Sequence, residues 1–123
     1  MDQEKYQHVQ MLDYQVKQLQ KILESIDAQL SEIHDTVEAL RAYGKLEKDG
    51  EILFPITNGI FAKGKLIDNK TLSINIGSNV VVEKSIPDTI SMMEKQAKDI
   101  ESYKSEVTTQ LQKFMEKIGE LEG

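Results

Sequence analysis

Residues 59–65 have the spacing of a phosphate-binding loop, in which glycines let backbone N–H groups surround phosphate oxygens and a lysine contacts them. The next residue of such a loop is Ser or Thr, whose hydroxyl binds Mg²⁺, whereas this chain has Leu66. The segment also lies in sequence with strand periodicity, not at the start of a helix. We therefore interpret it as strand and turn residues rather than a nucleotide site.

Other residue types that carry chemistry are sparse or scattered. The only histidines, His8 and His34, are far apart on one predicted helix, whereas a metal site needs several ligands that converge. The absence of cysteine excludes a thiolate metal site, a cysteine nucleophile and a disulfide. Acidic residues are spread along predicted helices, and paired catalytic carboxylates need a concave, partly desolvated site. We expect no catalytic residue, no metal and no cofactor.

Composition excludes further classes of function. The net charge of −6 disfavours nucleic acid as a partner, because phosphate binding needs clustered cations. No apolar run approaches the length of a membrane span, and the N-terminus lacks the pattern of a signal peptide. The chain of 123 residues is expected to form one domain, residues 1–123, in the cytoplasm and with no membrane partner.

Apolar residues recur every three or four positions in the N-terminal third of the chain. The positions are Val9, Leu12, Val16, Leu19, Leu23, Ile26, Leu30, Ile33, Val37 and Leu40. A sustained period of about 3.5 residues predicts a left-handed coiled coil, because surface helices of globular proteins follow a period nearer 3.6. We expect a helix over residues 3–44, roughly 60 Å long. It should end near Gly44, which can adopt the left-handed conformation of a C-terminal cap.

The C-terminal third repeats this spacing. Its positions are Ile86, Ile90, Met93, Ala97, Ile100, Lys104, Val107, Leu111, Phe114, Ile118 and Leu121. Lys104 is the polar member: either it fixes the register of the pairing, or its stem packs while its ammonium group reaches solvent. We favour the second reading. Ser85 and Asp88 have the spacing of a capping box, and Pro87 suits a first helical turn, so a helix is expected over residues 86–122.

Between these helices apolar residues alternate with polar ones. We expect four short strands, over residues 51–56, 60–67, 71–76 and 79–84, paired as two hairpins. The turn signals are Asn58-Gly59, Asp68-Asn69 and Gly77-Ser78. The apolar strand residues predicted to mediate oligomerisation are Ile52, Phe54, Ile56, Leu72, Ile74, Ile76, Val80 and Val82.

A strand segment that returns the chain lets the two helices run antiparallel. The fold class is therefore mainly α with a small β part: an antiparallel two-helix coiled coil joined by two β-hairpins. Matching the seams places Leu12 opposite Ile118. It also places Lys104 opposite Ile26. Two-stranded hairpins are marginal in isolation and their edges need partners, so residues 51–84 are predicted to form an oligomerisation segment.

The order helix, two hairpins, helix resembles the plan of a prefoldin alpha-type subunit. The resemblance is carried by Ile52-Leu53-Phe54-Pro55-Ile56, Gly59-Ile60-Phe61, Gly64-Lys65-Leu66, Ile74-Asn75-Ile76-Gly77 and Val82-Glu83-Lys84. These segments are similar to the family's apolar strand ending in Pro, its Gly-containing return and its closing Val-Glu-Lys strand. Four strands rather than two favour the alpha class over the beta class.

The resemblance implies an ATP-independent chaperone, a holdase, and not an enzyme. Two alpha-type and four beta-type prefoldin subunits would form a hetero-hexamer, with the hairpins assembled into a double β-barrel platform. The tips of the projecting coiled coils would bind unfolded client proteins and deliver them to a group II chaperonin. The alternative function is a structural coiled-coil scaffold or a filament-forming prefoldin-like protein. Mass in solution with and without a beta-type partner separates the two.

Apolar residues outside the heptad seam indicate where clients bind. Tyr6, Met11 and Tyr14 lie off the seam of the first helix, and Met115 lies off the seam of the second. Either they reflect chance and fraying ends, or they form an apolar tip. We favour the tip, because Met and Tyr suit a surface that accepts many partners. The predicted client-binding set is Tyr6, Val9, Met11, Leu12, Tyr14, Phe114, Met115, Ile118 and Leu121.

Overall fold

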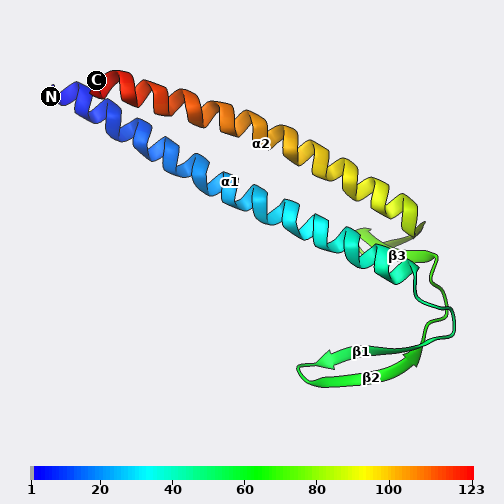
Figure 1. Ribbon diagram of the computed structural model, residues 1–123. Coiled ribbons are helices and arrows are strands. Elements are labelled where there is room, and N and C mark those ends of the chain that lie inside the picture. Colours follow the sequence, from blue (N-terminus) through cyan, green and yellow to red (C-terminus); the bar gives the residue numbers. More distant parts are fainter. Residues whose placement is uncertain (1) are drawn as a thin grey trace. The chain divides into compact units, whose positions relative to one another are not determined.

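The computed structural model describes residues 2–123, which form two long helices with four strands between them. The elements are α1 (Gln3–Gly44), β1 (Glu51–Thr57), β2 (Ile60–Lys65), β3 (Thr71–Gly77), β4 (Val80–Ser85) and α2 (Ile86–Glu122). β1 pairs antiparallel with β2, and β3 with β4, as two separate two-stranded sheets (Figure 1). The predicted fold class, with its two helices and two hairpins, is confirmed.

The chain divides into two compact units, Met1–Ile33 with Lys95–Gly123, and His34–Glu94. In the first unit the two helical segments lie side by side and antiparallel, and the two chain ends lie at the same end (Figure 1). Its buried residues are Leu12, Val16, Ile26 and Val107. The other predicted seam positions of this unit are half-buried. The heptad spacing therefore identifies the packed face of each helix.

Lys104 lies in the seam of this unit and forms an ion pair. Its Nζ is 2.6 Å from Oδ1 of Asp27, and the two side chains are 41% and 58% exposed. Asp27 follows Ile26, the residue predicted to lie opposite Lys104, so the ion pair agrees with the predicted register. An ion pair this exposed contributes about 0–1 kcal/mol. The ammonium group thus reaches the surface, as predicted, and meets a carboxylate there.

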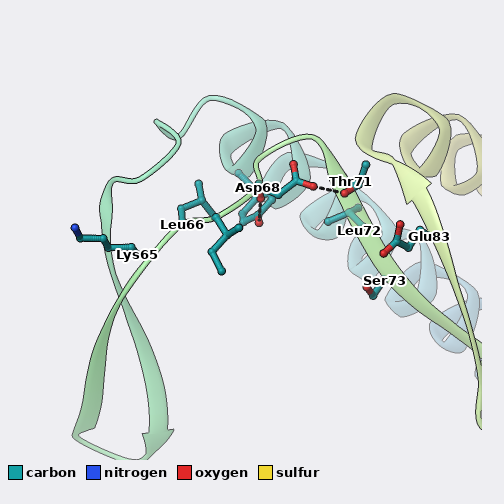
Figure 2. Close-up of a pocket in the computed structure, with 9 residues that line it drawn as sticks. Lys65, Leu66, Asp68, Thr71, Leu72, Ser73 and Glu83 are labelled. Carbon is teal, nitrogen blue, oxygen red and sulfur yellow. Dashed lines mark hydrogen bonds between the residues drawn. The ribbon is translucent and has the colours of Figure 1, made fainter.

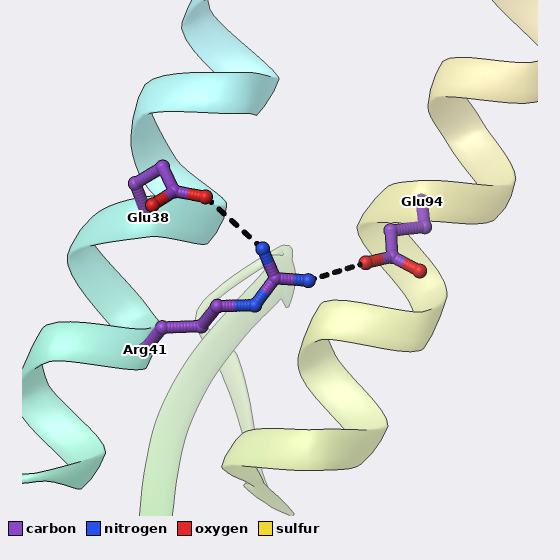
Figure 3. A network of polar contacts seen from close by, with 3 residues as sticks. All are labelled: Glu38, Arg41 and Glu94. Atoms are coloured by element: carbon purple, nitrogen blue, oxygen red, sulfur yellow. Dashed lines mark hydrogen bonds and ion pairs between the residues drawn. The ribbon is translucent and has the colours of Figure 1, made fainter.

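The second unit contains the end of α1, the hairpins and the start of α2. Its buried residues are Val37, Leu66, Ile86 and Thr89. Arg41 links the two helical segments: its Nη1 and Nη2 donate to the carboxylates of Glu38 and Glu94, each at 3.0 Å (Figure 3). All three side chains are about half exposed, so these contacts orient the helices more than they stabilise them.

The start of α2 has one of the two hydrogen bonds of the predicted capping box. Oγ of Ser85 accepts a hydrogen bond from the N–H of Asp88 at 3.1 Å, which satisfies one of the free donors of the first turn. The Thr89 hydroxyl, although buried, donates to the Ser85 carbonyl at 2.9 Å. The N–H of Ile86 donates to the Lys70 carbonyl at 3.0 Å. The first turn of α2 is therefore tied to the start of β3.

The end of α1 differs from the prediction. The helix does end at Gly44, but the glycines with positive φ are Gly59 and Gly77, so a left-handed Gly44 cap was wrong. Instead, the N–H groups of Lys45 and Leu46 donate to carbonyls three residues earlier, each at 3.1 Å. Such a tightened last turn satisfies helix carbonyls without a left-handed residue.

We expect Gly44→Ala to stabilise the protein. Gly44 needs no positive φ, and a Cβ there would lie 3.6 Å from Cδ1 of Ile86, an ordinary contact. Alanine is favoured over glycine in a helix by up to about 1 kcal/mol, and less in a last turn. Thermal unfolding followed by circular dichroism should show a higher midpoint. A lower midpoint would show that residue 44 does need glycine's backbone freedom.

The hairpin turns are set by residues with positive φ. Gly59 (φ 77°) closes the first hairpin. In the second, Ser78 (φ 49°) and Asn79 (φ 62°) form the two-residue turn, one position later than the predicted Gly77-Ser78 break. Two consecutive left-handed residues match the twist of the flanking strands. β2 ends at Lys65, so the prediction that this strand reaches residue 67 was also wrong.

Candidate functional site

The residues first considered for chemistry lie in separate parts of the described structure. No three or more metal-ligating side chains gather anywhere in residues 2–123, and His8 and His34 are both exposed. The phosphate-loop spacing falls on a hairpin turn and β2, with no helix after it. In the part of the chain that the structure describes, no helix is long and apolar enough to cross a membrane. The notable features are exposed apolar surfaces.

The first hairpin exposes apolar side chains on both faces. On the predicted face Ile52 is half-buried, Phe54 is 47% exposed and Ile56 is 65% exposed. Gly64 makes room for the Phe54 ring, because a Cβ at residue 64 would lie 3.2 Å from Cε1 of that ring. The predicted surface is therefore largely open to a partner.

The opposite face of this hairpin was not predicted to be functional. It carries Pro55 with Leu53 (61% exposed) on β1 and Phe61 (58% exposed) on β2, beside the charged residues Glu51, Lys63 and Lys65. Alternation places these side chains opposite those of Ile52 and Phe54. The unbroken apolar run from residue 52 to 56 could have predicted this second face. Apolar and polar residues alternate in a strand with one face in solvent, whereas a strand that is covered on both faces is apolar throughout.

The second hairpin is apolar on one face only. Leu72, Ile74 and Val82 are half-buried on the predicted face, with Ile74 directly across from Val82, and the charged residue of this face is Lys84, across from Leu72. The predicted residues Ile76 and Val80 are exposed, by 63% and 49%. The opposite face carries Thr71, Ser73, Asn75, Val81 and Glu83, of which only Val81 is apolar. This hairpin therefore offers a partner one apolar face.

The connection between the hairpins is held by hydrogen bonds to the end of α1 and to the residues just after it. The Tyr43 hydroxyl donates to the Asp68 carbonyl at 2.7 Å, and Nδ2 of Asn69 donates to the Leu46 carbonyl at 2.8 Å. The buried Leu66 exchanges backbone hydrogen bonds with residues 49 and 50 at the root of the first hairpin. The sequence pattern gave no sign of these contacts.

The same connection borders a shallow open cavity of about 430 Å³ (Figure 2). The residues lining it are Tyr43, Lys65, Leu66, Ile67, Asp68, Thr71, Leu72, Ser73 and Glu83. The Asp68 carboxylate accepts hydrogen bonds from the Thr71 hydroxyl and, at 2.7 Å, from the N–H of Lys70. These hydrogen bonds hold the pKa of Asp68 below its ordinary value, and the bond from the Thr71 hydroxyl has the largest effect. The carboxylate therefore caps the turn into β3.

We expect Asp68→Asn to loosen this turn at neutral pH. The pKa of Asp68 is lower in the folded state, so the ionised carboxylate stabilises the fold at pH values above its ordinary pKa of 3.8. This stabilisation is lost as the pH falls through the pKa of the folded state. Amide exchange at Lys70 should be faster in the variant at neutral pH, and the difference should shrink in acid. A difference that is independent of pH would show that the charge plays no part.

The predicted client-binding residues divide into two groups. Leu12 is buried, and Val9, Phe114, Ile118 and Leu121 are half-buried in the seam. The four off-seam residues are exposed: Tyr6 by 52%, Met11 by 62%, Tyr14 by 64% and Met115 by 54%. The Tyr6 hydroxyl also accepts a hydrogen bond from Nε2 of Gln10 at 2.9 Å. All nine residues belong to the unit in which the two chain ends lie together, and their role in binding stays a prediction.

Comparison with known proteins identifies the family. The family model described as prefoldin subunit matches residues 12–123. Prefoldin subunit alpha of Pyrococcus horikoshii is 32% identical over 113 residues, covering 91% of this chain and 76% of that protein. Prefoldin subunit alpha of Methanococcus vannielii is 26% identical over 121 residues, covering 98% and 81%.

A solved structure of filamentous prefoldin from Methanocaldococcus jannaschii has the same fold. The two superpose with a TM-score of 0.82 at 16% identity, covering 94% of this chain and 96% of that one. The sequence match through both helices and both hairpins, together with this fold, shows that the chain belongs to the prefoldin family of chaperones as an alpha-type subunit.

Proposed function

We propose that this chain is a subunit of an ATP-independent holdase that binds unfolded polypeptides in the cytoplasm through the tips of its coiled coil. The observation that carries the proposal is the exposure of four apolar side chains outside the seam, Tyr6, Met11, Tyr14 and Met115. The helices pair through the heptad seam, so these side chains are not needed for the pairing. They are available to a client.

Such a tip binds any chain that exposes apolar groups, because apolar contact is non-directional and needs no sequence code. Each side chain contributes roughly 1.5–3 kcal/mol at full burial, and less in partial contact. One tip therefore binds weakly. Several tips around one client raise the effective concentration and give useful retention without a nucleotide. Release then follows from competition by a downstream group II chaperonin.

The partners that complete this assembly are beta-type prefoldin subunits, in a hexamer of two alpha and four beta chains joined through the hairpins. Support comes from the exposed apolar faces of both hairpins, and from the instability of an isolated two-stranded sheet. Large exposed apolar surfaces usually mark interfaces, so we expect other subunits to bury these strand faces.

A second candidate is a filament built from this chain alone. The observation that favours it is the fold shared with the filamentous M. jannaschii prefoldin. The two candidates differ in whether the assembly is closed or open. When subunits join through unlike surfaces, they form a ring if the rotation from one subunit to the next completes a full circle, and an open fibre if it does not. Light scattering of the chain with and without a beta-type subunit distinguishes a closed hexamer from a fibre.

The holdase is tested by diluting a chemically denatured model protein into buffer that contains the assembled complex and no ATP. We expect turbidity to be suppressed in proportion to the complex added. Bovine serum albumin at equal mass is the control for unspecific protection. Aggregation as fast as with albumin would contradict the proposal.

A further inference from the structure

The methionines of this chain fall into two groups with different surroundings. Among the residues that the structure describes, they are Met11, Met92, Met93 and Met115. Met11 and Met115 are 62% and 54% exposed, whereas Met92 and Met93 are half-buried near the start of α2. The chain has no cysteine, so all of its sulfur is in methionine thioethers. Any reaction of this chain with a mild sulfur oxidant is therefore a reaction of methionine.

The half-buried pair is shielded within the second unit. Met93 occupies a position of the heptad seam, where its side chain packs against the other helix. Sδ of Met92 accepts a hydrogen bond from Nζ of Lys84 at 3.7 Å, in a partly buried contact. A sulfur lone pair is the group that attacks an oxidant, and at Met92 the ammonium group engages it. Both thioethers should therefore react slowly.

The exposed pair lies where a polar group can be added without unfolding the helices. Met11 is on α1 and Met115 on α2, in the unit in which the two chain ends lie together. Both are off the seam, and the helices pair through their neighbours, the buried Leu12 and the half-buried Phe114. Oxidation at these two positions therefore changes the surface near the chain ends and leaves the packed face intact.

We infer, on the basis of the proposed holdase function, that Met11 and Met115 are modification sites at which a peroxide converts the thioether to a sulfoxide and weakens client binding. The sulfur lone pair attacks one oxygen of hydrogen peroxide, so an S–O bond forms and the O–O bond breaks. The departing hydroxide takes the proton from the new S–OH group and leaves as water. Sulfur loses two electrons, which the peroxide gains. Methionine sulfoxide reductases reverse the change.

The sulfoxide weakens binding because the contact between tip and client is apolar. A thioether side chain is flexible and apolar, and it adapts to clients of different shape. A sulfoxide oxygen that is covered by an apolar client segment loses its water and gains no hydrogen-bond donor, which costs free energy. Tyr6 and Tyr14 keep their rings, so client protection should fall without disappearing.

The first test needs no client. The assembled complex is treated with hydrogen peroxide, and the sulfoxide content of each methionine is followed by mass spectrometry of its peptides. Met11 and Met115 should be oxidised at least about threefold faster than Met92 and Met93, because their sulfur atoms are open to the oxidant. Equal rates at the four positions, or faster oxidation of the half-buried pair, would overturn the assignment of the sites.

The second test measures protection of a denatured client before and after peroxide. It compares the unsubstituted complex with a variant that carries both Met11→Leu and Met115→Leu, which keeps apolar side chains of similar size but has no sulfur at the tip. After peroxide, the concentration of unsubstituted complex that gives half-maximal protection should rise about threefold or more, because losses at several tips compound. The value for the leucine variant should not change, and methionine sulfoxide reductase should restore the unsubstituted complex.

Equal loss of protection in the two complexes would place the oxidant-sensitive group elsewhere and overturn the inference, as would full protection by the oxidised complex. In the second case the holdase itself stands, because the untreated complex protects. If neither untreated complex protects the client, the holdase proposal fails, and the effect assigned to oxidation fails with it. Helical circular dichroism and mass by light scattering should be the same before and after peroxide.

Discussion

Ile74→Asp is expected to abolish assembly while leaving both helices folded. Ile74 is half-buried at the centre of the apolar face of the second hairpin, directly across from Val82. In the proposed assembly another subunit covers this face, so a carboxylate at residue 74 is buried without a directly opposed cation: its cross-strand partner is Val82, and Lys84 lies one pair further along the same face. Burying an unpaired charge costs several kcal/mol, which exceeds what one such contact can recover. The variant should therefore elute as a monomer of 14.0 kDa.

Asn75→Asp is the matched control. It adds the same charge one residue away, on the opposite face of the same strand, where the side chain is exposed. Oδ1 of Asn75 accepts a hydrogen bond from the Gly77 N–H at 2.9 Å, which an aspartate also accepts. We expect this variant to assemble normally, and both variants to keep their helical circular dichroism. Full assembly by Ile74→Asp would disprove the platform model.

Removing the exposed apolar side chains near the chain ends is expected to abolish most client protection. The variant replaces the four off-seam residues with Gln: Tyr6, Met11, Tyr14 and Met115. All four are more than half exposed, so the helix pairing should be retained. In the proposed assembly the contacts at several tips act together, so a small loss of affinity at each tip becomes a large loss of client retention. Turbidity of a denatured client should approach that of the client alone.

The matched control is Tyr103→Gln, which removes an aromatic side chain of α2 that is 49% exposed and lies outside the tip set. It should protect clients as the unsubstituted complex does. A truncation that removes roughly the first and last ten residues should likewise assemble but fail to protect. Full protection by the four-fold variant would place client binding elsewhere, and the strand platform would be the next surface to test.

Local patterns in the sequence were sufficient for most of the fold. The heptad spacing identified the packed face of both helices, because residues three and four apart in a helix share a face wherever the partner lies. The Ser85 cap was likewise predictable, since the cap and the N–H that it accepts are three residues apart. Strand alternation located both hairpins for the same reason: the period depends only on backbone geometry.

Boundaries and partners were decided by the tertiary structure. Gly44 ends α1 without a left-handed conformation, in a place where Ile86 of α2 lies close to it. Lys104 meets Asp27, 77 residues away, and Tyr43 meets the Asp68 carbonyl, 25 residues away. No periodic signal specifies such pairs, because each depends on where two separate segments come together.

The candidate surfaces follow the same division. The sequence by itself determined that apolar side chains lie off the seam at Tyr6, Met11, Tyr14 and Met115, since a seam position is defined by spacing alone. Only the tertiary structure decided that Leu53 and Phe61 make a second exposed face on the first hairpin, and that Leu66 is buried at its root. A side chain's exposure depends on every segment that folds against it, and in the described part of the chain Leu53, Phe54 and Phe61 of the first hairpin stay 61%, 47% and 58% exposed.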